Sequence, residues 1–156
     1  MQDRAARATM LIRVSIAEVF DAFVRPEKLT RFWLEAASAP LAKDARVTWR
    51  FMVPGATETV TVTDFAAPGR IAFDWSDGLH VDLGFREHGP GVTQVTAEVT
   101  GFIADTGIAL IVDATEGYSI DLCDLKTLLE TGHSAHLVRD KAELITASLA
   151  GRGSGA

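Results

Sequence analysis

Residues 71–83 read Ile-Ala-Phe-Asp-Trp-Ser-Asp-Gly-Leu-His-Val-Asp-Leu, and this stretch decides the fold. Apolar and polar side chains alternate on both sides of the Ser-Asp-Gly triplet, which is typical of two antiparallel strands joined by a tight turn. Residues directly opposite each other share a face of the sheet, so a two-residue turn would place Trp75 against the polar His80. A three-residue loop with Gly78 in the left-handed conformation instead pairs Trp75 with Leu79 and Phe73 with Val81. We predict this second register.

The same alternation extends over residues 45–100, interrupted by turn residues at Pro54-Gly55, Pro68-Gly69 and Gly89-Pro90-Gly91. It predicts an antiparallel meander. Residues 8–14 are rich in branched apolar side chains and predict one further strand, which gives a sheet of about six strands. One face of the meander collects the apolar residues Val47, Trp49, Phe51, Val60, Val62, Ile71, Phe73, Trp75, Leu79, Val81, Leu83, Val95, Ala97 and Val99.

Helices are predicted on both sides of the meander. Residues 15–18, Ser-Ile-Ala-Glu, form a capping box that starts a helix at Ile16, which ends before Pro26, and a second short helix begins at Pro26. From Glu116 to about Thr131 the apolar residues Tyr118, Leu122, Leu125 and Leu129 recur at helical spacing, which predicts a long helix with one buried stripe. Asp140 is expected to cap a last helix over 141–149, and residues 102–115 are predicted as a partly helical connection.

Composition excludes several classes of partner. The 156 residues include 15 Lys and Arg against 21 Asp and Glu, a net charge of -6. Nucleic acids and anionic membranes both call for clustered basic side chains, so neither is expected as a partner. We expect a single domain over 8–149 and a disordered, Gly-rich tail over 151–156. Short apolar runs, a polar N-terminus and the single cysteine, Cys123, predict a cytoplasmic protein without an intrachain disulfide.

The predicted order of elements is a strand, two short helices, a curved meander and a long C-terminal helix. Together with residues 15–23, Pro26-Glu27-Lys28-Leu29, Phe32-Trp33, Gly117-Tyr118 and 125–130, this order resembles the START-like or SRPBCC superfamily. The branch it resembles is the one named after the activator of the heat-shock-protein-ninety ATPase, and the resemblance covers roughly residues 8–131. It implies an α+β helix-grip fold, in which the sheet wraps around the long helix and leaves an apolar cavity between them.

The residues expected to line this cavity are Trp33, Trp49, Phe51, Phe73, Trp75, Val81, Ala97, Tyr118 and Leu122. Large rings on a concave apolar face are typical of small-molecule sites. The alternative is that these side chains only fill the core, as most aromatic stripes do. Tyr118 begins the inward stripe of the long helix, and its hydroxyl could orient a ligand or could lie at the rim of a packed core.

Other groups that could carry chemistry have simpler explanations. Asp74 and His80 are cross-strand neighbours on the polar face, as expected for a solvated surface pair. His133 and His136 lie near Asp140 but lack a third ligand at a recognised spacing, and Cys123, between Asp121 and Asp124, is expected to be a buried, inert thiol. We attribute the acidic residues Asp113, Glu116, Asp121 and Asp124 to capping at the start of the long helix and to solubility.

The resemblance implies a binder of lipids, polyketides, hormones or other hydrophobic molecules. We therefore expect non-catalytic binding of a hydrophobic small molecule, without a metal or a cofactor, and a homodimer is an open alternative to a monomer. A cyclase or hydrolase acting in the same cavity is the alternative from the enzyme class, but the sequence places no ionisable pair inside the cavity. A co-chaperone acting through its surface is the third hypothesis.

Overall fold

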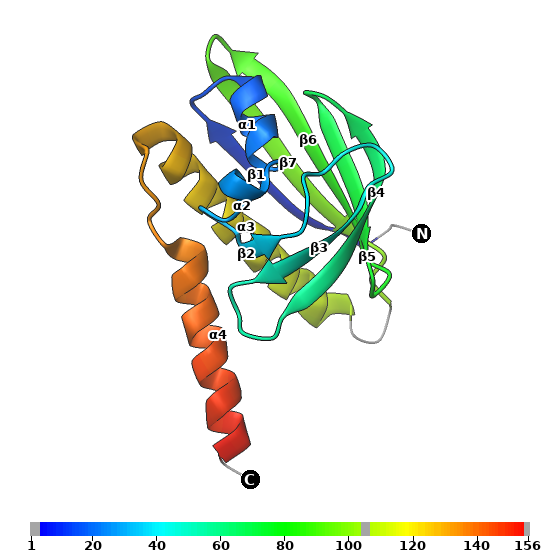
Figure 1. Cartoon of the computed structure of the whole chain (residues 1–156), viewed down its shortest axis with the longest axis vertical. Coiled ribbons are helices and arrows are strands. Elements are labelled where there is room, and N and C mark those ends of the chain that lie inside the picture. The colour runs from blue at the N-terminus through cyan, green and yellow to red at the C-terminus, as the bar shows by residue number, and fades with distance from the viewer. Residues whose placement is uncertain (1–3, 104–106, 155–156) are drawn as a thin grey trace.

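The computed structural model describes residues 4–103 and 107–154, and it has the predicted α+β helix-grip architecture (Figure 1). A single antiparallel sheet has the strand order β1-β7-β6-β5-β4-β3-β2. The strands are β1 (Ala6–Ile12), β2 (Leu34–Ala37), β3 (Arg46–Phe51), β4 (Thr57–Ala66), β5 (Arg70–Trp75), β6 (His80–Gly89) and β7 (Val92–Thr100). The helices are α1 (Ile16–Ala22), α2 (Pro26–Leu29), α3 (Gly107–Thr131) and α4 (Leu137–Ser154). Figure 1 shows α3 lying across the curled sheet and α4 extending away from it.

The β5–β6 hairpin has the predicted register. Phe73 pairs with Val81 and Asp74 with His80, while the Trp75 N–H donates to the Leu79 carbonyl at 2.9 Å. Gly78 has a φ of +92°, in the left-handed region that favours glycine. Alternation of apolar side chains was therefore sufficient to choose between the two loop lengths.

The apolar face of the meander forms the core, as predicted. Most of its members are buried, and Leu122, Leu125 and Leu128 of α3 close the same cluster from the other side. The sheet has one strand more than the sequence indicated, because β2 pairs with β3 through an irregular register between Leu34 and Ala36. A strand of four residues, following directly on the Phe32-Trp33 segment, is too short to show a period of two. β1 also begins earlier than expected, at Ala6.

The helices differ from the prediction mainly in their ends. α1 begins at Ile16 with Ser15 accepting a hydrogen bond from the Glu18 N–H at 3.4 Å, as the capping box predicts, but it ends at Ala22. α3 begins at Gly107 and not near Glu116, so most of the predicted connection 102–115 is helical, and residues 104–106 lie outside the described part. Ile108 and Val112 in its first turns are exposed, so this segment has no buried stripe that would reveal a helix.

The last helix is longer than predicted and begins elsewhere. α4 starts at Leu137, so Asp140 lies inside the helix and is not its cap. The cap comes from α3, because the Asp124 carboxylate accepts a hydrogen bond from the Val138 N–H at 3.1 Å. A cap supplied by another helix leaves no local sequence signal. α4 ends at Ser154, within the segment 151–156 that composition predicts to be disordered, and residues 155–156 lie outside the described part.

Candidate functional site

A cleft of about 340 Å³ lies where one end of the sheet meets α3 and α4. Its sheet side is formed by Trp33, Phe51, Met52, Val53, Ala56, Trp75, Leu79 and Val99. Its helical side is formed by Ala114, Gly117, Tyr118, Ile120 and Asp121 from α3, and by Val138, Lys141, Ala142 and Ile145 from α4. Most of this lining is apolar, and the volume lies within the range of pockets that hold small organic molecules.

Four of the predicted site residues, Trp33, Phe51, Trp75 and Tyr118, line this cleft together. Their rings contact one another: the centroids of Trp33 and Tyr118 are 5.7 Å apart, and those of Phe51 and Trp75 are 5.8 Å apart. These separations are typical of edge-to-face and tilted aromatic pairs. The four rings come from the α2–β2 connection, β3, β5 and α3, so only the tertiary fold brings them together.

The four rings of Trp33, Phe51, Trp75 and Tyr118 form an aromatic wall of the cleft. The remaining five predicted site residues lie in the packed core next to this wall. They are Trp49, Phe73, Val81, Ala97 and Leu122, all buried. Trp49 lies between the wall and the core, with its ring centroid 5.0 Å from that of Trp33 and 5.4 Å from that of Phe73. The cleft is therefore nearer the rim of the sheet than the middle of the concave face.

Asp121 introduces an ionisable group that the sequence did not place in the cavity. Its side chain lines the cleft, and the residue is 7% exposed. Burial, and secondarily the charge of Asp124, raises the pKa of the Asp121 carboxyl well above its ordinary value. The expectation that Asp121 and Asp124 cap the start of the helix is wrong, because α3 begins at Gly107 and both residues lie in its interior.

The helical spacing contains a signal that would have identified Asp121. The residues of one helical stripe follow the spacing i, i+3, i+4 and i+7: Tyr118, Asp121, Leu122 and Leu125. A helix that turns Tyr118 and Leu125 inward therefore also turns Asp121 inward. The predicted stripe of the long helix contained only apolar residues, so Asp121 was not part of it. The same reasoning does not identify Lys141 as a cleft residue. The last helix was predicted to begin at Lys141, so no helical stripe included it.

Tyr118 also presents a polar group to the cleft. Its hydroxyl is buried, the indole N–H of Trp75 acts on it as a weak donor, and the hydroxyl proton has no acceptor among the described residues. Burial, and then the charge of Asp121, raises the pKa of this phenol well above its usual value, so the hydroxyl keeps its proton at neutral pH. A buried hydroxyl proton without an acceptor is energetically unfavourable unless a ligand or water accepts it.

We expect Asp121→Asn to change how stability depends on pH. In the native state the Asp121 pKa lies above the unfolded value of about 3.9, so the unfolded chain releases this proton first as pH rises. The contribution of Asp121 to stability is complete below the unfolded pKa and is lost as pH rises through the native pKa. Between about pH 4 and 8, the wild type should therefore lose more than about 1 kcal/mol relative to the variant. Urea denaturation at both pH values measures this, and parallel pH dependences would contradict it.

Two further contacts join α3 to the α4 side of the cleft. The Asp124 carboxylate, which is buried, accepts hydrogen bonds from the Ser134 hydroxyl at 3.0 Å and from the Val138 N–H. The Lys141 ammonium forms an ion pair with Glu116. The first contact fixes the start of α4, and the second places a paired charge beside the cleft.

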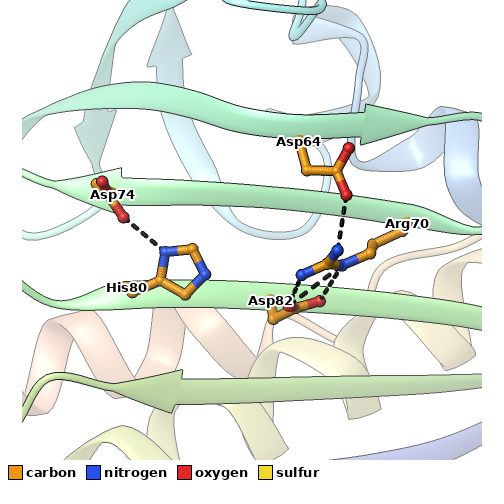
Figure 2. Close-up of polar contacts among 5 residues, drawn as sticks. All are labelled: Asp64, Arg70, Asp74, His80 and Asp82. Atoms are coloured by element: carbon orange, nitrogen blue, oxygen red, sulfur yellow. Dashed lines mark hydrogen bonds and ion pairs between the residues drawn. The ribbon is translucent and has the colours of Figure 1, made fainter.

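The Asp74–His80 pair lies on the opposite, outer face of the sheet, as predicted (Figure 2). His80 Nδ1 is 2.6 Å from Asp74 Oδ1, and both side chains are substantially exposed. Figure 2 also shows Arg70 between Asp64 and Asp82 on this face, and the hydrogen bond and charge of Asp82 raise the pKa of the guanidinium. Exposed pairs of this kind contribute little to stability.

The other candidate groups do not join the cleft. His133 and His136 lie in the connection between α3 and α4, and no group of three or more His, Cys, Asp or Glu side chains within the described residues could hold a metal ion. Cys123 is half-buried, more accessible than predicted, beside a separate hollow between α3 and α4. No helix in the described part combines the length and apolar composition needed to cross a membrane.

Comparison with known proteins agrees with this architecture. The sequence pattern of the family described as "Activator of Hsp90 ATPase homolog 1-like protein" matches residues 13–130. The chain belongs to this family. The match begins after β1 and ends near the end of α3, so α4 of this Hsp90-activator-like chain lies outside it. No curated protein matches the chain.

Several solved protein structures have a fold similar to that of this chain. A protein from Staphylococcus saprophyticus is 27% identical, with a TM-score of 0.76 over 84% of this chain and 95% of that one. The Aha1 dimer from Colwellia psychrerythraea is 15% identical, with a TM-score of 0.73 over 83% of this chain and 98% of that one. DynU16, from the dynemicin biosynthetic locus, is 20% identical, with a TM-score of 0.75 over 85% of this chain and 49% of that one.

Proposed function

We propose that this Hsp90-activator-like protein binds a hydrophobic small molecule in the cleft between the rim of the sheet, α3 and α4. The observation that carries this proposal is a preformed cleft of about 340 Å³ with an aromatic wall and a buried Tyr118 hydroxyl whose proton has no acceptor among the described residues. Protein interiors normally pack densely, and a preformed apolar void beside an unsatisfied donor is the arrangement that ligand sites use. The ligand would replace water against Trp33, Phe51 and Trp75.

The test uses 1-phenylnaphthylamine, a neutral apolar dye, added to the full chain. Saturable dye emission with quenching of tryptophan emission is the expected result, because Trp33 and Trp75 line the cleft. Native mass spectrometry of freshly purified protein gives a second readout, a retained small molecule. Absence of saturable dye binding would overturn the proposal.

Gly117→Leu should lower the affinity for this dye by about tenfold or more. Gly117 lines the cleft from the middle of α3, and a Cβ added there meets no atom within 4 Å, so a leucine would extend into the space the dye needs. Gly117→Ala is the matched control. It should retain dye affinity within about twofold and raise the free energy of unfolding by about 1 kcal/mol through its helix propensity. Equal affinities for both variants would place the dye elsewhere.

Catalysis is the second candidate function, and Asp121 is the observation that favours it. A buried carboxyl whose pKa is raised well above its ordinary value can act as a general acid on a bound substrate. The occurrence of the similar DynU16 fold in a biosynthetic locus is compatible with small-molecule chemistry on this scaffold. A cyclase or hydrolase of this type would lose turnover in Asp121→Asn while retaining dye binding, whereas a pure binding protein would have no turnover to lose.

The remaining expectations concern location and assembly. We propose a cytoplasmic protein, because a single cysteine without a disulfide partner suits a reducing compartment. We also propose a homodimer as its assembly, since the relative from Colwellia psychrerythraea is a dimer and α4 exposes Leu144 and Leu149. A co-chaperone role, suggested by the family description, would use the surface and not the cleft.

A further inference from the structure

We infer that Tyr118 and Asp121 form a two-donor site that selects, among apolar ligands, neutral molecules carrying a carbonyl oxygen. This inference rests on the proposed function and names the chemical class of ligand for the same cleft. A carbonyl oxygen has two lone pairs, so it can accept one hydrogen bond from each group.

The geometry of α3 places the two groups together. Tyr118 and Asp121 are three residues apart on one helix, so their side chains lie on the same face, and both line the cleft. The Tyr118 hydroxyl proton has no acceptor among the described residues, although the Trp75 indole N–H acts on the phenol as a weak donor, and the Asp121 carboxyl is buried beside it. The rest of the nearby lining is apolar, so a ligand is the natural partner for both groups.

The charges around the pair favour a neutral acceptor. Burial favours the protonated form of the Asp121 carboxyl, and in that form it is a donor, as is the Tyr118 phenol. A ligand carboxylate would be repelled by the charge of Asp124, which already acts on Asp121. The cation at the cleft, Lys141, is already paired with Glu116. A ketone, aldehyde or ester keeps the acceptor oxygen without this repulsion or the cost of burying a charge.

Benzophenone and 1,1-diphenylethylene provide the test, because they have nearly the same shape and differ in a carbonyl oxygen against a methylene group. Each displaces 1-phenylnaphthylamine from the full chain, and affinities are measured for the wild type, Tyr118→Phe and Asp121→Leu. The two compounds differ in solubility in water, and this difference affects their affinities equally in every variant. The affinity ratio of the two compounds in the wild type is therefore divided by the same ratio in each variant, which cancels the effect of solubility. Val138→Ala, an apolar change in the cleft lining, is the matched control.

Tyr118→Phe should weaken benzophenone binding by roughly threefold to tenfold and leave 1,1-diphenylethylene within about twofold, as expected for one lost hydrogen bond. Asp121→Leu should do the same, and Val138→Ala should shift both compounds equally. Diphenylacetate, an anion of similar size, should bind the wild type about tenfold more weakly than benzophenone. If the dye binds but the ratio is the same in the wild type and both variants, or benzophenone fails to displace it, the carbonyl site is refuted while the binding function stands. If the dye itself does not bind, the proposed function fails and this inference with it.

Discussion

Trp49→Ala is expected to lower the free energy of unfolding by about 3–5 kcal/mol, the largest effect of any substitution considered for this protein. Trp49 is fully buried, and its ring contacts Trp33, Phe73 and Trp75 at centroid distances of 5.0, 5.4 and 5.7 Å. Truncation would remove these contacts and leave a cavity at the junction of the aromatic wall and the core. Urea denaturation followed by far-ultraviolet circular dichroism measures the loss.

Trp49→Phe is the control, and it should cost much less than the alanine variant. The Trp49 indole N–H is buried without a hydrogen-bond partner in the described part of the chain, so replacing it with an apolar ring removes an unsatisfied donor along with some packing. A loss below about 1 kcal/mol for Trp49→Ala would show that this residue borders an open cavity, as the sequence suggested, and not a packed core.

Asp124→Ala should lower the free energy of unfolding by about 2–4 kcal/mol. The substitution leaves the Ser134 hydroxyl and the Val138 N–H without their carboxylate acceptor, and hydrogen bonds to charged groups are worth about 1.5–3 kcal/mol each. Denaturation gives the magnitude, and amide hydrogen exchange should show the loss of protection concentrated at the start of α4.

Asp113→Ala is the matched control on the same helix. Asp113 is exposed on α3, so its removal should change stability by less than about 0.5 kcal/mol. If Asp124→Ala were equally neutral, or if exchange increased uniformly over the chain, the capping of α4 by α3 would not contribute to stability.

Much of the fold follows from patterns that span only a few residues. The alternation around Trp75 selects the inward face, and the position of Gly78 selects the loop, because strand pairing requires opposed residues to share a face. The capping box at Ser15 likewise specifies where α1 begins. In each case the decisive interaction joins residues close in sequence, so the signal lies within one short window.

The candidate site was predictable only in part. The sequence identified Trp33, Phe51, Trp75 and Tyr118 as candidate ligand contacts, and these four residues line the cleft. The sequence could not distinguish these four residues from Trp49 and Phe73, because all six carry large rings that are predicted to point inward. The position of each ring along the curved sheet decides which of them borders open space.

The sequence by itself determined the class of fold, the inward face of the sheet and the presence of a long helix against it. Only the tertiary structure decided that the inward-facing Asp121 meets an open cleft and that Asp124 caps α4. The helical spacing can place Asp121 on the inward face of α3, but whether that face meets open space depends on where α4 packs. The packing of α4 creates the far wall of the cleft, and contacts between separate elements leave no periodic trace in the chain.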